Sequence, residues 1–334
     1  MNLLLVQTSF LGDTILSTPV ITGLRERFPE ADLWMMTTPE SAHLVKRDPF
    51  LAGVIPYDKR KAQSGFAGLR QMANRLREME FDRVYALHRS PRTAVLLKLS
   101  GIPVRVGFHD SKLGFLYTQR QTRSLEIHDV LRNLSILSGE RPLSRLNTDM
   151  RLFAPEKEEM NPDFLSLLPP SGKYVLLVPG SVWNTKRWSL QGYRDVIKYL
   201  NNTAYKVVLN GSPGERPLLE EIASGLDVMN IAGKIGISET LYVTKNARLV
   251  VCNDSMALHM ASAFKIPNVA IFCATSPRFG FSPWKNRAVV VERADLPCKP
   301  CRRHGSQKCP NGTWECINGL ASGKVIQAME KLLG

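Results

Sequence analysis

The chain has 334 residues, which is enough for two globular domains, and its hydrophobic content of 44% and charged content of 22% are those of an ordinary folded protein. Lysine and arginine outnumber aspartate and glutamate by 44 to 30, so the formal net charge is +14 and the expected partners are anionic. The basic residues follow no zinc-finger, RRM-like or basic-zipper pattern, which argues against nucleic acid as a partner. Because no signal peptide and no run of about 18 apolar residues is present, we expect a cytoplasmic protein that contacts a membrane only peripherally.

Short apolar, β-branched runs alternate with helix-like segments along the chain, which predicts parallel sheets covered by helices on both faces. The expected strands of the first half are 3–6, 33–36, 83–87 and 104–106, and those of the second half are 174–178, 206–209, 228–231, 249–252 and 269–272. The amphipathic segments that predict helices include 19–28, 68–79, 190–201 and 217–225. This pattern indicates two doubly wound, Rossmann-like halves.

A proline-rich segment separates the two halves, because four prolines lie between residues 155 and 170. We therefore expect an N-terminal domain at 1–154, a linker at 155–172, a second domain at 173–322, and a C-terminal helix at 323–334 that packs on either domain. Two doubly wound domains that face each other would leave a ligand cleft between them.

The first expected strand is followed by the motif TSFLGDT, residues 8–14. The motif lacks the three spaced glycines of a dinucleotide-binding fingerprint, so it does not predict a dinucleotide site. Gly12 permits a tight turn, and Asp13 begins the next helix, where it either caps that helix or acts as a general base. Thr8 and Gly12 are expected to contact the substrate.

The motif PGSVWNTKRW, residues 179–188, follows the first strand of the second half. Small and hydroxyl residues followed by a lysine suit a diphosphate, with Ser181 and Lys186 as the expected contacts. The alternative is a solvated basic loop. Trp188 is expected to pack at the start of the next helix.

Two further motifs follow strands of the second half. In GSPGE, residues 211–215, Glu215 either accepts from ribose hydroxyls or caps the next helix. In NDSMALH, residues 253–259, Asp254 and Ser255 lie where open α/β sheets bind phosphate-bearing ligands, and His259 shares a helix face with Ser255. The alternative is an ordinary N-cap followed by a partly buried histidine.

Six cysteines occur, and Cys252 and Cys273 lie within expected core strands, as small buried hydrophobes do. The other four are Cys298, Cys301, Cys309 and Cys316, with His304 between them. Four thiols in this spacing can hold zinc, form a labile disulfide or stay free, and only one close pair is present where strong zinc motifs have two. No HExxH, GxSxG or paired-carboxylate signature indicates a hydrolase or a phosphoryl-transfer enzyme.

Taken together, these motifs resemble a known family. The segments SFLGD (9–13), KRWSL (186–190), VLNGS (208–212), IAG (231–233) and NDSxxxH (253–259) occur in the order seen in bacterial lipopolysaccharide heptosyltransferases of glycosyltransferase family 9. The heptosyltransferase II type is the most similar, and the N-terminal segments GIPxRxG (101–107) and HxxxR (128–132) agree with it.

The resemblance implies a GT-B architecture, with two Rossmann-like domains facing a cleft, the acceptor on the N-terminal domain and the nucleotide sugar on the C-terminal domain. It implies inverting transfer of a heptose from ADP-heptose to the lipid A-linked core oligosaccharide, without a metal or another cofactor, at the inner face of the cytoplasmic membrane. Carried over to this chain, Asp13 is the general base, and Lys186 with Ser181 holds the diphosphate. The residues that line the ADP site are Asp254, Ser255 and His259, and Glu215 contacts the ribose.

One residue departs from the family pattern. Met256 stands where the family usually has glycine after Asp-Ser, and its side chain would narrow the pocket for the nucleotide phosphate. This keeps open a different donor, such as a UDP-hexose. A third interpretation is a non-catalytic protein that binds a nucleotide sugar or lipopolysaccharide, but the presence of both Asp13 and Lys186 argues against it.

Overall fold

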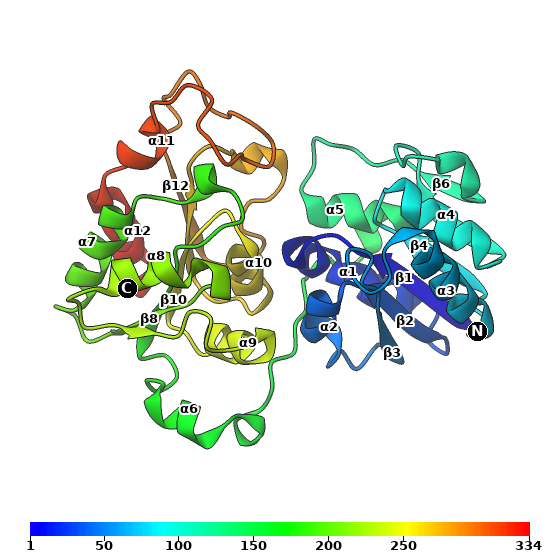
Figure 1. The fold of residues 1–334 in the computed structure, drawn as a ribbon, viewed down its shortest axis with the longest axis horizontal. Helices are drawn as coiled ribbons and strands as arrows, with labels where there is room; N and C mark the ends of the chain where they lie inside the picture. Colours follow the sequence, from blue (N-terminus) through cyan, green and yellow to red (C-terminus); the bar gives the residue numbers. More distant parts are fainter. The chain divides into compact units, whose positions relative to one another are not determined.

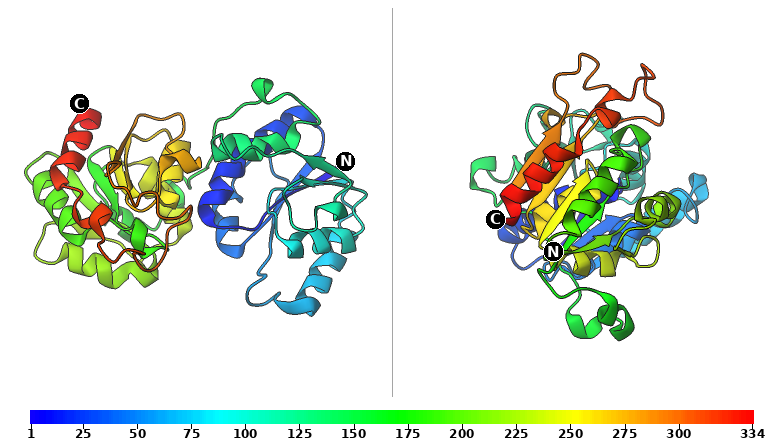
Figure 2. Two further views of the ribbon diagram at one scale, coloured as in Figure 1. Left: turned by 90° about the horizontal axis from the view of Figure 1, so that it is seen from above. Right: turned by 90° about the vertical axis from the view of Figure 1, so that its left-hand side faces the viewer.

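A computed structural model describes residues 1–334, and the chain divides into two compact units, Met1–Phe153 and Ala154–Gly334. Each unit contains one six-stranded sheet, and every strand pair in both sheets is parallel (Figure 1). Helices cover the sheet faces, as the views of Figure 2 show. The predicted α/β class with two doubly wound sheets is confirmed.

The first sheet has the strand order β3-β2-β1-β4-β5-β6. Its strands are β1 (Asn2–Gln7), β2 (Asp32–Thr37), β3 (Gly53–Pro56), β4 (Arg83–Ala86), β5 (Val104–Phe108) and β6 (Gln119–Gln121). The α-helices of this unit are α1 (Leu11–Arg27), α2 (Pro39–Val45), α3 (Gly65–Glu78), α4 (Pro91–Leu99) and α5 (Asp129–Leu134). From β1 the sheet is extended to one side by β2 and β3, and to the other side by β4, β5 and β6. The topological switch point therefore lies at the carboxyl ends of β1 and β4.

The second sheet has the order β12-β11-β10-β7-β8-β9. Its strands are β7 (Tyr174–Val178), β8 (Lys206–Leu209), β9 (Met229–Asn230), β10 (Leu249–Asn253), β11 (Asn268–Phe272) and β12 (Ala288–Glu292). The α-helices are α6 (Pro162–Leu167), α7 (Leu190–Leu200), α8 (Arg216–Ala223), α9 (Ile237–Lys245), α10 (Met256–Ala263), α11 (Glu315–Asn318) and α12 (Ser322–Leu333). Counted within its own unit, this strand order is the same as in the first sheet, and the switch point lies between β7 and β10.

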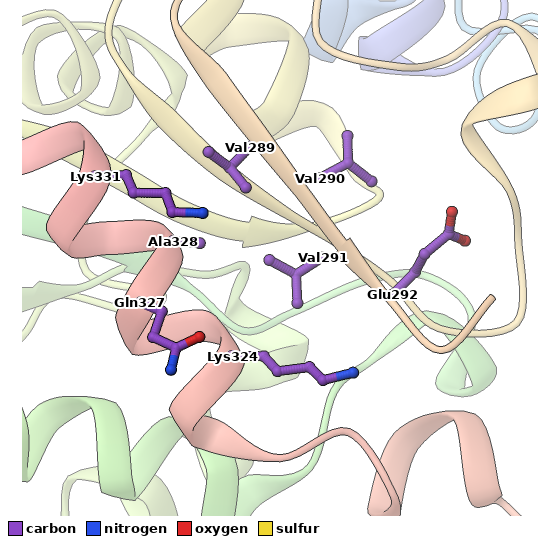
Figure 3. Close-up of a pocket in the computed structure, with 8 residues that line it drawn as sticks. All are labelled: Val289, Val290, Val291, Glu292, Lys324, Gln327, Ala328 and Lys331. Carbon is purple, nitrogen blue, oxygen red and sulfur yellow. The ribbon is translucent and has the colours of Figure 1, made fainter. Parts of the chain in front are cut away.

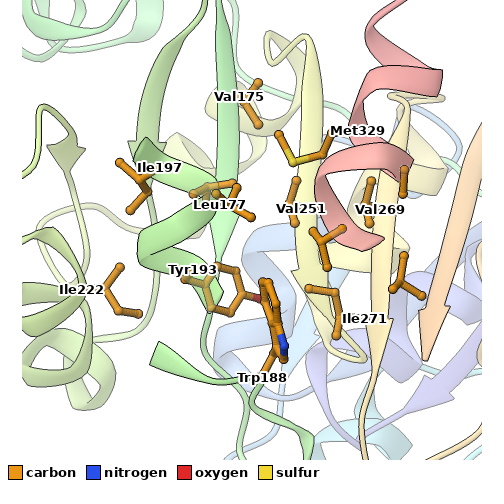
Figure 4. Packing of buried hydrophobic residues seen from close by; sticks show 14 of the residues in the cluster. Val175, Leu177, Trp188, Tyr193, Ile197, Ile222, Val251, Val269, Ile271 and Met329 are labelled. Carbon is orange, nitrogen blue, oxygen red and sulfur yellow. The ribbon is translucent and has the colours of Figure 1, made fainter. Parts of the chain in front are cut away.

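Alternate residues of the central strands enter two different cores of the second unit. Val175 and Leu177 belong to a cluster that also contains Tyr193 of α7 and Met329 of α12 (Figure 4). Leu176 belongs to the cluster on the opposite face of the sheet. Because both faces are covered, the central strands are apolar almost throughout, and this is why they could be predicted as continuous runs.

Helix α1 differs from the expectation of an amphipathic helix over 19–28. It runs continuously from Leu11 to Arg27, through Pro19, and every residue from Thr14 to Leu24 is buried. Proline lacks the N–H that would bond the carbonyl of Ile15, and the Thr18 hydroxyl donates to that carbonyl instead, at 2.8 Å. The expectation of a tight turn at Gly12 is also wrong, because Gly12 lies in the first turn of α1 and does not have a positive φ. Its contact with the substrate stays a prediction.

Three strands were missed, and all three lie at an edge of their sheet: β3, β6 and β12. Edge strands are short and need no continuous apolar run, and β6 consists only of Gln-Arg-Gln. The proline-rich segment expected as a linker contains α6 and belongs to the second unit. The C-terminal helix α12 packs on the second unit, where Val325 and Met329 enter its core.

Candidate functional site

The carboxyl end of the second sheet brings two predicted motifs, 179–188 and 253–259, together in an ion pair. The Lys186 Nζ lies 2.6 Å from Asp254 Oδ2, and the two side chains are 12% and 5% exposed. The Thr275 hydroxyl, from the loop after β11, donates to the same carboxylate oxygen at 2.8 Å. An ammonium group has three N–H donors, so this pair fixes Lys186 while leaving it able to bind a further anion.

The loop after β7 is tied to the end of β10 across the switch point. The buried Asn253 side chain donates from Nδ2 to the Pro179 carbonyl at 2.6 Å and accepts at Oδ1 from the Trp188 N–H at 3.1 Å. Ser181 is buried in this loop, and its carbonyl accepts from Arg187 Nε at 2.8 Å. Sequence reasoning gave Asn253 no role, although it belongs to the same motif as Asp254.

Helix α10 begins at Met256, directly after the switch-point strand β10, so its free N–H groups lie where an anion can bind. Ser255 is the N-cap residue with extended backbone, and its buried hydroxyl has no hydrogen-bond partner. His259 is buried one turn further along α10. The N-cap alternative describes the position of Ser255 but not its hydroxyl, which does not cap the helix.

Glu215 connects the loop after β8 with the loop after β7. Its Oε2 accepts from both the N–H and the hydroxyl of Ser212, each at 2.8 Å, and these bonds close the 3-10 turn Pro213–Glu215. Glu215 is also the N-cap residue of α8, but its side chain makes no cap bond to that helix. Its carboxylate also lies against Gly180, because a Cβ atom built at Gly180 would be 2.2 Å from it. The absence of a side chain at Gly180 therefore lets Glu215 reach the edge of the Lys186 loop.

Trp188 packs in the core as expected. It is buried, and its ring meets that of Tyr193 edge-on, with 5.1 Å between the ring centroids (Figure 4). Its Nε1 donates to the Leu320 carbonyl at 3.1 Å, so the start of α7 is anchored to the segment before α12.

Asp13 lies in the first turn of α1, after the switch-point strand β1 of the first sheet. Its Oδ2 accepts from the Phe10 N–H at 3.3 Å, which is the capping contact that the sequence left as an alternative. The role of Asp13 as a base stays a prediction.

A half-buried basic network occupies the switch point of the first sheet. His88 Nδ1, after β4, lies 3.0 Å from Thr8 Oγ1 and 2.9 Å from Thr93 Oγ1. The Lys59 Nζ donates to Thr8 Oγ1 at 3.3 Å and lies 3.5 Å from His88 Nε2. Sequence reasoning expected only Thr8 here, because β3, the strand that leads to Lys59, was not recognised.

No carboxylate pairs with Lys59, and the charges around it are positive. Burial first, and then Arg60 and Arg92, lower the pKa of Lys59 to about 8. Burial, followed by Lys59, Arg89 and Arg60, lowers the pKa of His88 to about 4, so His88 is neutral at pH 7. Because an ion buried without a counter-charge is unfavourable, this network is suited to receive an anionic group.

All six cysteines are free thiols, and no three His, Cys, Asp or Glu side chains are placed to hold a metal ion. Burial tends to raise the pKa of the Cys309 thiol, but backbone N–H groups of residues 311–314 bring it below its ordinary value. No helix combines the length and the apolar character that crossing a bilayer requires.

A separate hollow lies between β12 and α12 (Figure 3). It is lined by Val289, Val290, Val291, Glu292, Lys324, Gln327, Ala328 and Lys331. None of the predicted site residues lines it, so it is distinct from the two switch points.

Comparison with known proteins agrees with this arrangement. The sequence profile of the family described as glycosyltransferase family 9 (heptosyltransferase) matches residues 69–311. The chain belongs to glycosyltransferase family 9. It is therefore a glycosyltransferase, and the resemblance drawn from the five ordered motifs is confirmed.

Relatives in this family are similar over most of their length. The chain is 25% identical to lipopolysaccharide heptosyltransferase 2 of Escherichia coli K12 over 306 residues, which are 87% of this chain and 88% of that protein. It is 26% identical to lipopolysaccharide heptosyltransferase 1 of Pseudomonas aeruginosa over 315 residues, 90% of this chain and 86% of that protein. Relatives of different types are thus equally similar, and the type within the family is not resolved by identity.

Solved structures of heptosyltransferases share the fold. The structure of the E. coli ADP-heptose lipopolysaccharide heptosyltransferase II has a TM-score of 0.82 and 23% identity, covering 100% of this chain and 98% of that one. The E. coli heptosyltransferase WaaC with ADP has a TM-score of 0.77 and 20% identity, covering 99% and 100%. The predicted GT-B fold is confirmed.

Proposed function

We propose that this family 9 glycosyltransferase transfers a heptose from ADP-heptose to the inner core of lipopolysaccharide, with inversion at the anomeric carbon and without a metal ion. The names of the curated relatives support the sugar and the acceptor, and the structure of WaaC with ADP supports the nucleotide. The observation that carries the proposal is the position of Lys186, a cation fixed at the switch point of the second sheet, where such folds bind phosphates.

The donor would bind along the carboxyl end of the second sheet. Lys186 and Ser181 would contact the diphosphate, and the free N–H groups at the start of α10 with the Ser255 hydroxyl would add donors to it. Glu215 would accept from the ribose, and Asp254 and His259 would line the nucleotide site. These residues would stabilise the negative charge that grows on the departing ADP, which is the role that a divalent cation has in other enzymes.

The acceptor would bind at the first sheet. Its hydroxyl oxygen would attack the anomeric carbon, the bond between this carbon and the diphosphate oxygen would break, and Asp13 would take the hydroxyl proton. The uncompensated charge of Lys59 supports an acceptor that carries an anionic group. Thr8, after β1, and Gly12, in the first turn of α1, would be further contacts. The surplus of positive charge supports peripheral contact with the anionic inner face of the cytoplasmic membrane.

Titration calorimetry with ADP and UDP, in EDTA, tests the donor assignment. We expect ADP to bind at least about tenfold more tightly than UDP, and transfer from ADP-heptose to a lipid A-linked core acceptor to proceed in EDTA with inverted stereochemistry. A preference for UDP would favour the second candidate, a different nucleotide-sugar donor, which Met256 at the first position of α10 supports. Binding of neither nucleotide would contradict both.

A further inference from the structure

The cysteine-rich segment, residues 298–316, packs on the loop that carries Lys186. Thr185 and Ser306 bond each other in both directions: the Thr185 N–H and hydroxyl donate to the Ser306 carbonyl, at 3.1 and 2.9 Å, and the Ser306 N–H donates to Thr185 Oγ1 at 2.8 Å. Three hydrogen bonds thus hold the residue immediately before Lys186.

Gln307 adds bonds to the residues before Thr185. The Asn184 side chain donates to the Gln307 carbonyl at 3.3 Å, and Gln307 Nε2 donates to the Val182 carbonyl at 3.0 Å. The loop from Val182 to Thr185 is therefore bonded along its length by Ser306 and Gln307, two residues more than 120 positions away in the sequence.

The cysteine-rich segment is itself fixed to the second sheet. The Lys299 side chain is only 3% exposed, and its Nζ donates to the Phe272 carbonyl and to Glu292, each at 2.6 Å. The Cys301 N–H donates to the Ala274 carbonyl at 2.9 Å, and the Ala274 N–H donates to the Thr185 carbonyl at 3.2 Å. Thr185 is consequently held from two sides, by Ser306 and by the end of β11.

Gly305 brings the backbone of this segment against the Lys186 side chain. Its φ is +78°, and a Cβ atom at this position would lie 3.1 Å from Lys186 Cγ, 3.1 Å from Trp183 Cβ and 3.2 Å from Thr185 Oγ1. A methyl group would therefore have to displace the stem of Lys186 or the segment by a few tenths of an ångström. Because a lysine side chain has many rotamers, a backbone packed against its stem restricts where the ammonium group lies.

We propose that Gly305, Ser306 and Gln307 form a positioning element that orients Lys186 toward the diphosphate of the donor. None of the three touches the ligand, and they act through the Val182–Lys186 loop. The inference rests on the proposed function, since it takes Lys186 to be the residue that binds the diphosphate. It also gives a purpose to the cysteine-rich segment, which the family motifs do not include.

A matched pair of glycine substitutions tests this positioning. Gly305→Ala adds a methyl group against Lys186, whereas Gly312→Ala adds one at a similar φ of +70° in the same segment, with nothing within 4 Å. Both variants carry the same backbone strain, and Gly305→Ala also displaces its neighbours, so we expect small decreases in Tm that are somewhat larger for Gly305→Ala. We expect Gly305→Ala to weaken ADP binding about tenfold, without changing the affinity for adenosine, and Gly312→Ala to change neither.

A double-mutant cycle with Lys186→Met shows whether the effect passes through Lys186. In the Lys186→Met background, Gly305→Ala should change the Kd for ADP by less than about twofold. Gln307→Ala, which strains no backbone, is a second variant and should weaken ADP binding several-fold in the Lys186 background only. An equal loss in both backgrounds, or a Gly305→Ala protein that binds ADP like Gly312→Ala, would overturn the inference alone. A wild-type protein that does not bind ADP would overturn the proposed function and this inference together.

Discussion

The two sheets have the same topology but hold their lysines differently. At the switch point of the second sheet, Lys186 is paired with the buried carboxylate of Asp254. At the switch point of the first sheet, the Lys59 ammonium contacts the polar atoms of Thr8 and His88, and the charges of Arg60 and Arg92 lower its pKa. Topology therefore sets where a ligand binds, whereas the local charge balance sets what each site does. A paired lysine is held in place before the ligand arrives, and an unpaired one is suited to receive its counter-charge from a ligand.

The first sheet is proposed to carry the general base and the second sheet to bind the nucleotide. Asp13→Asn tests this separation with the largest expected effect. Asparagine keeps the oxygen that accepts from the Phe10 N–H, so the cap of α1 remains, but it cannot take a proton. We expect kcat to fall by about a thousandfold or more, with the Kd for ADP unchanged within about twofold. Steady-state kinetics and calorimetry measure the two quantities. Turnover close to that of the wild type would remove Asp13 as the base.

Lys186→Met should affect the second site alone. It removes a charge-assisted contact to the diphosphate, so we expect ADP binding to weaken by about a hundredfold. It also leaves Asp254 buried without its partner, which should lower the free energy of unfolding by about 3 kcal/mol. The double variant Lys186→Met/Asp254→Asn should recover stability but not ADP affinity. Recovery of both would show that Lys186 serves the fold and not the ligand.

Lys59→Met should raise the free energy of unfolding, whereas Lys186→Met should lower it. The pKa of Lys59 is about 8 in the folded protein, below its ordinary value of 10.5, so folding disfavours the charged form. That penalty is complete below pH 8 and disappears as the pH rises to about 10.5, where the unfolded chain also loses the proton. We expect a gain of about 1 kcal/mol at pH 7, reduced from the full shift because the amine is partly exposed, and no gain at about pH 10.5.

Thermal unfolding of Lys59→Met at the two pH values measures this effect, and the exposed neighbour Lys61 provides the control. Lys61→Met should change the Tm at neither pH. Lys59→Met should also raise the KM for an anionic acceptor while leaving the Kd for ADP unchanged. A loss of stability at pH 7 would mean that Lys59 has a counter-charge in the free protein, and the contrast with Lys186 would fail.

The sequence allowed the central parts of the fold to be predicted, for a physical reason. β7, β8, β10 and β11 are buried on both faces or nearly so, and this leaves a continuous apolar run in the sequence. The edge strands β3 and β6 carry no long run of this kind, and β6 is entirely polar. The edge strand β12 does have an apolar run, Ala288 to Val291, but it was not recognised as a strand. The helix start at Asp13 and the amphipathic segment 19–28 were predicted separately, and only the structure shows one continuous helix in which the Thr18 hydroxyl replaces the donor that Pro19 lacks.

The site residues of the second unit were found because each lies in the segment that follows a predictable strand, as Asp254 follows β10. The contacts that join them depend on residues far apart in the chain, and no spacing rule indicates that Thr185 meets Ser306 or that Lys186 meets Asp254. Lys59 was missed for the same reason, since its approach to Thr8 follows from the unrecognised strand β3.

Hydrogen–deuterium exchange with and without ADP tests the central claim most directly, because it reports both switch points of the intact protein at once. We predict that ADP slows exchange in the loops after β7, β8 and β10 and at the start of α10, and leaves the turn between β1 and α1 and the Lys59 segment unchanged. Protection at the first switch point instead of the second would contradict the division of roles between the two sheets.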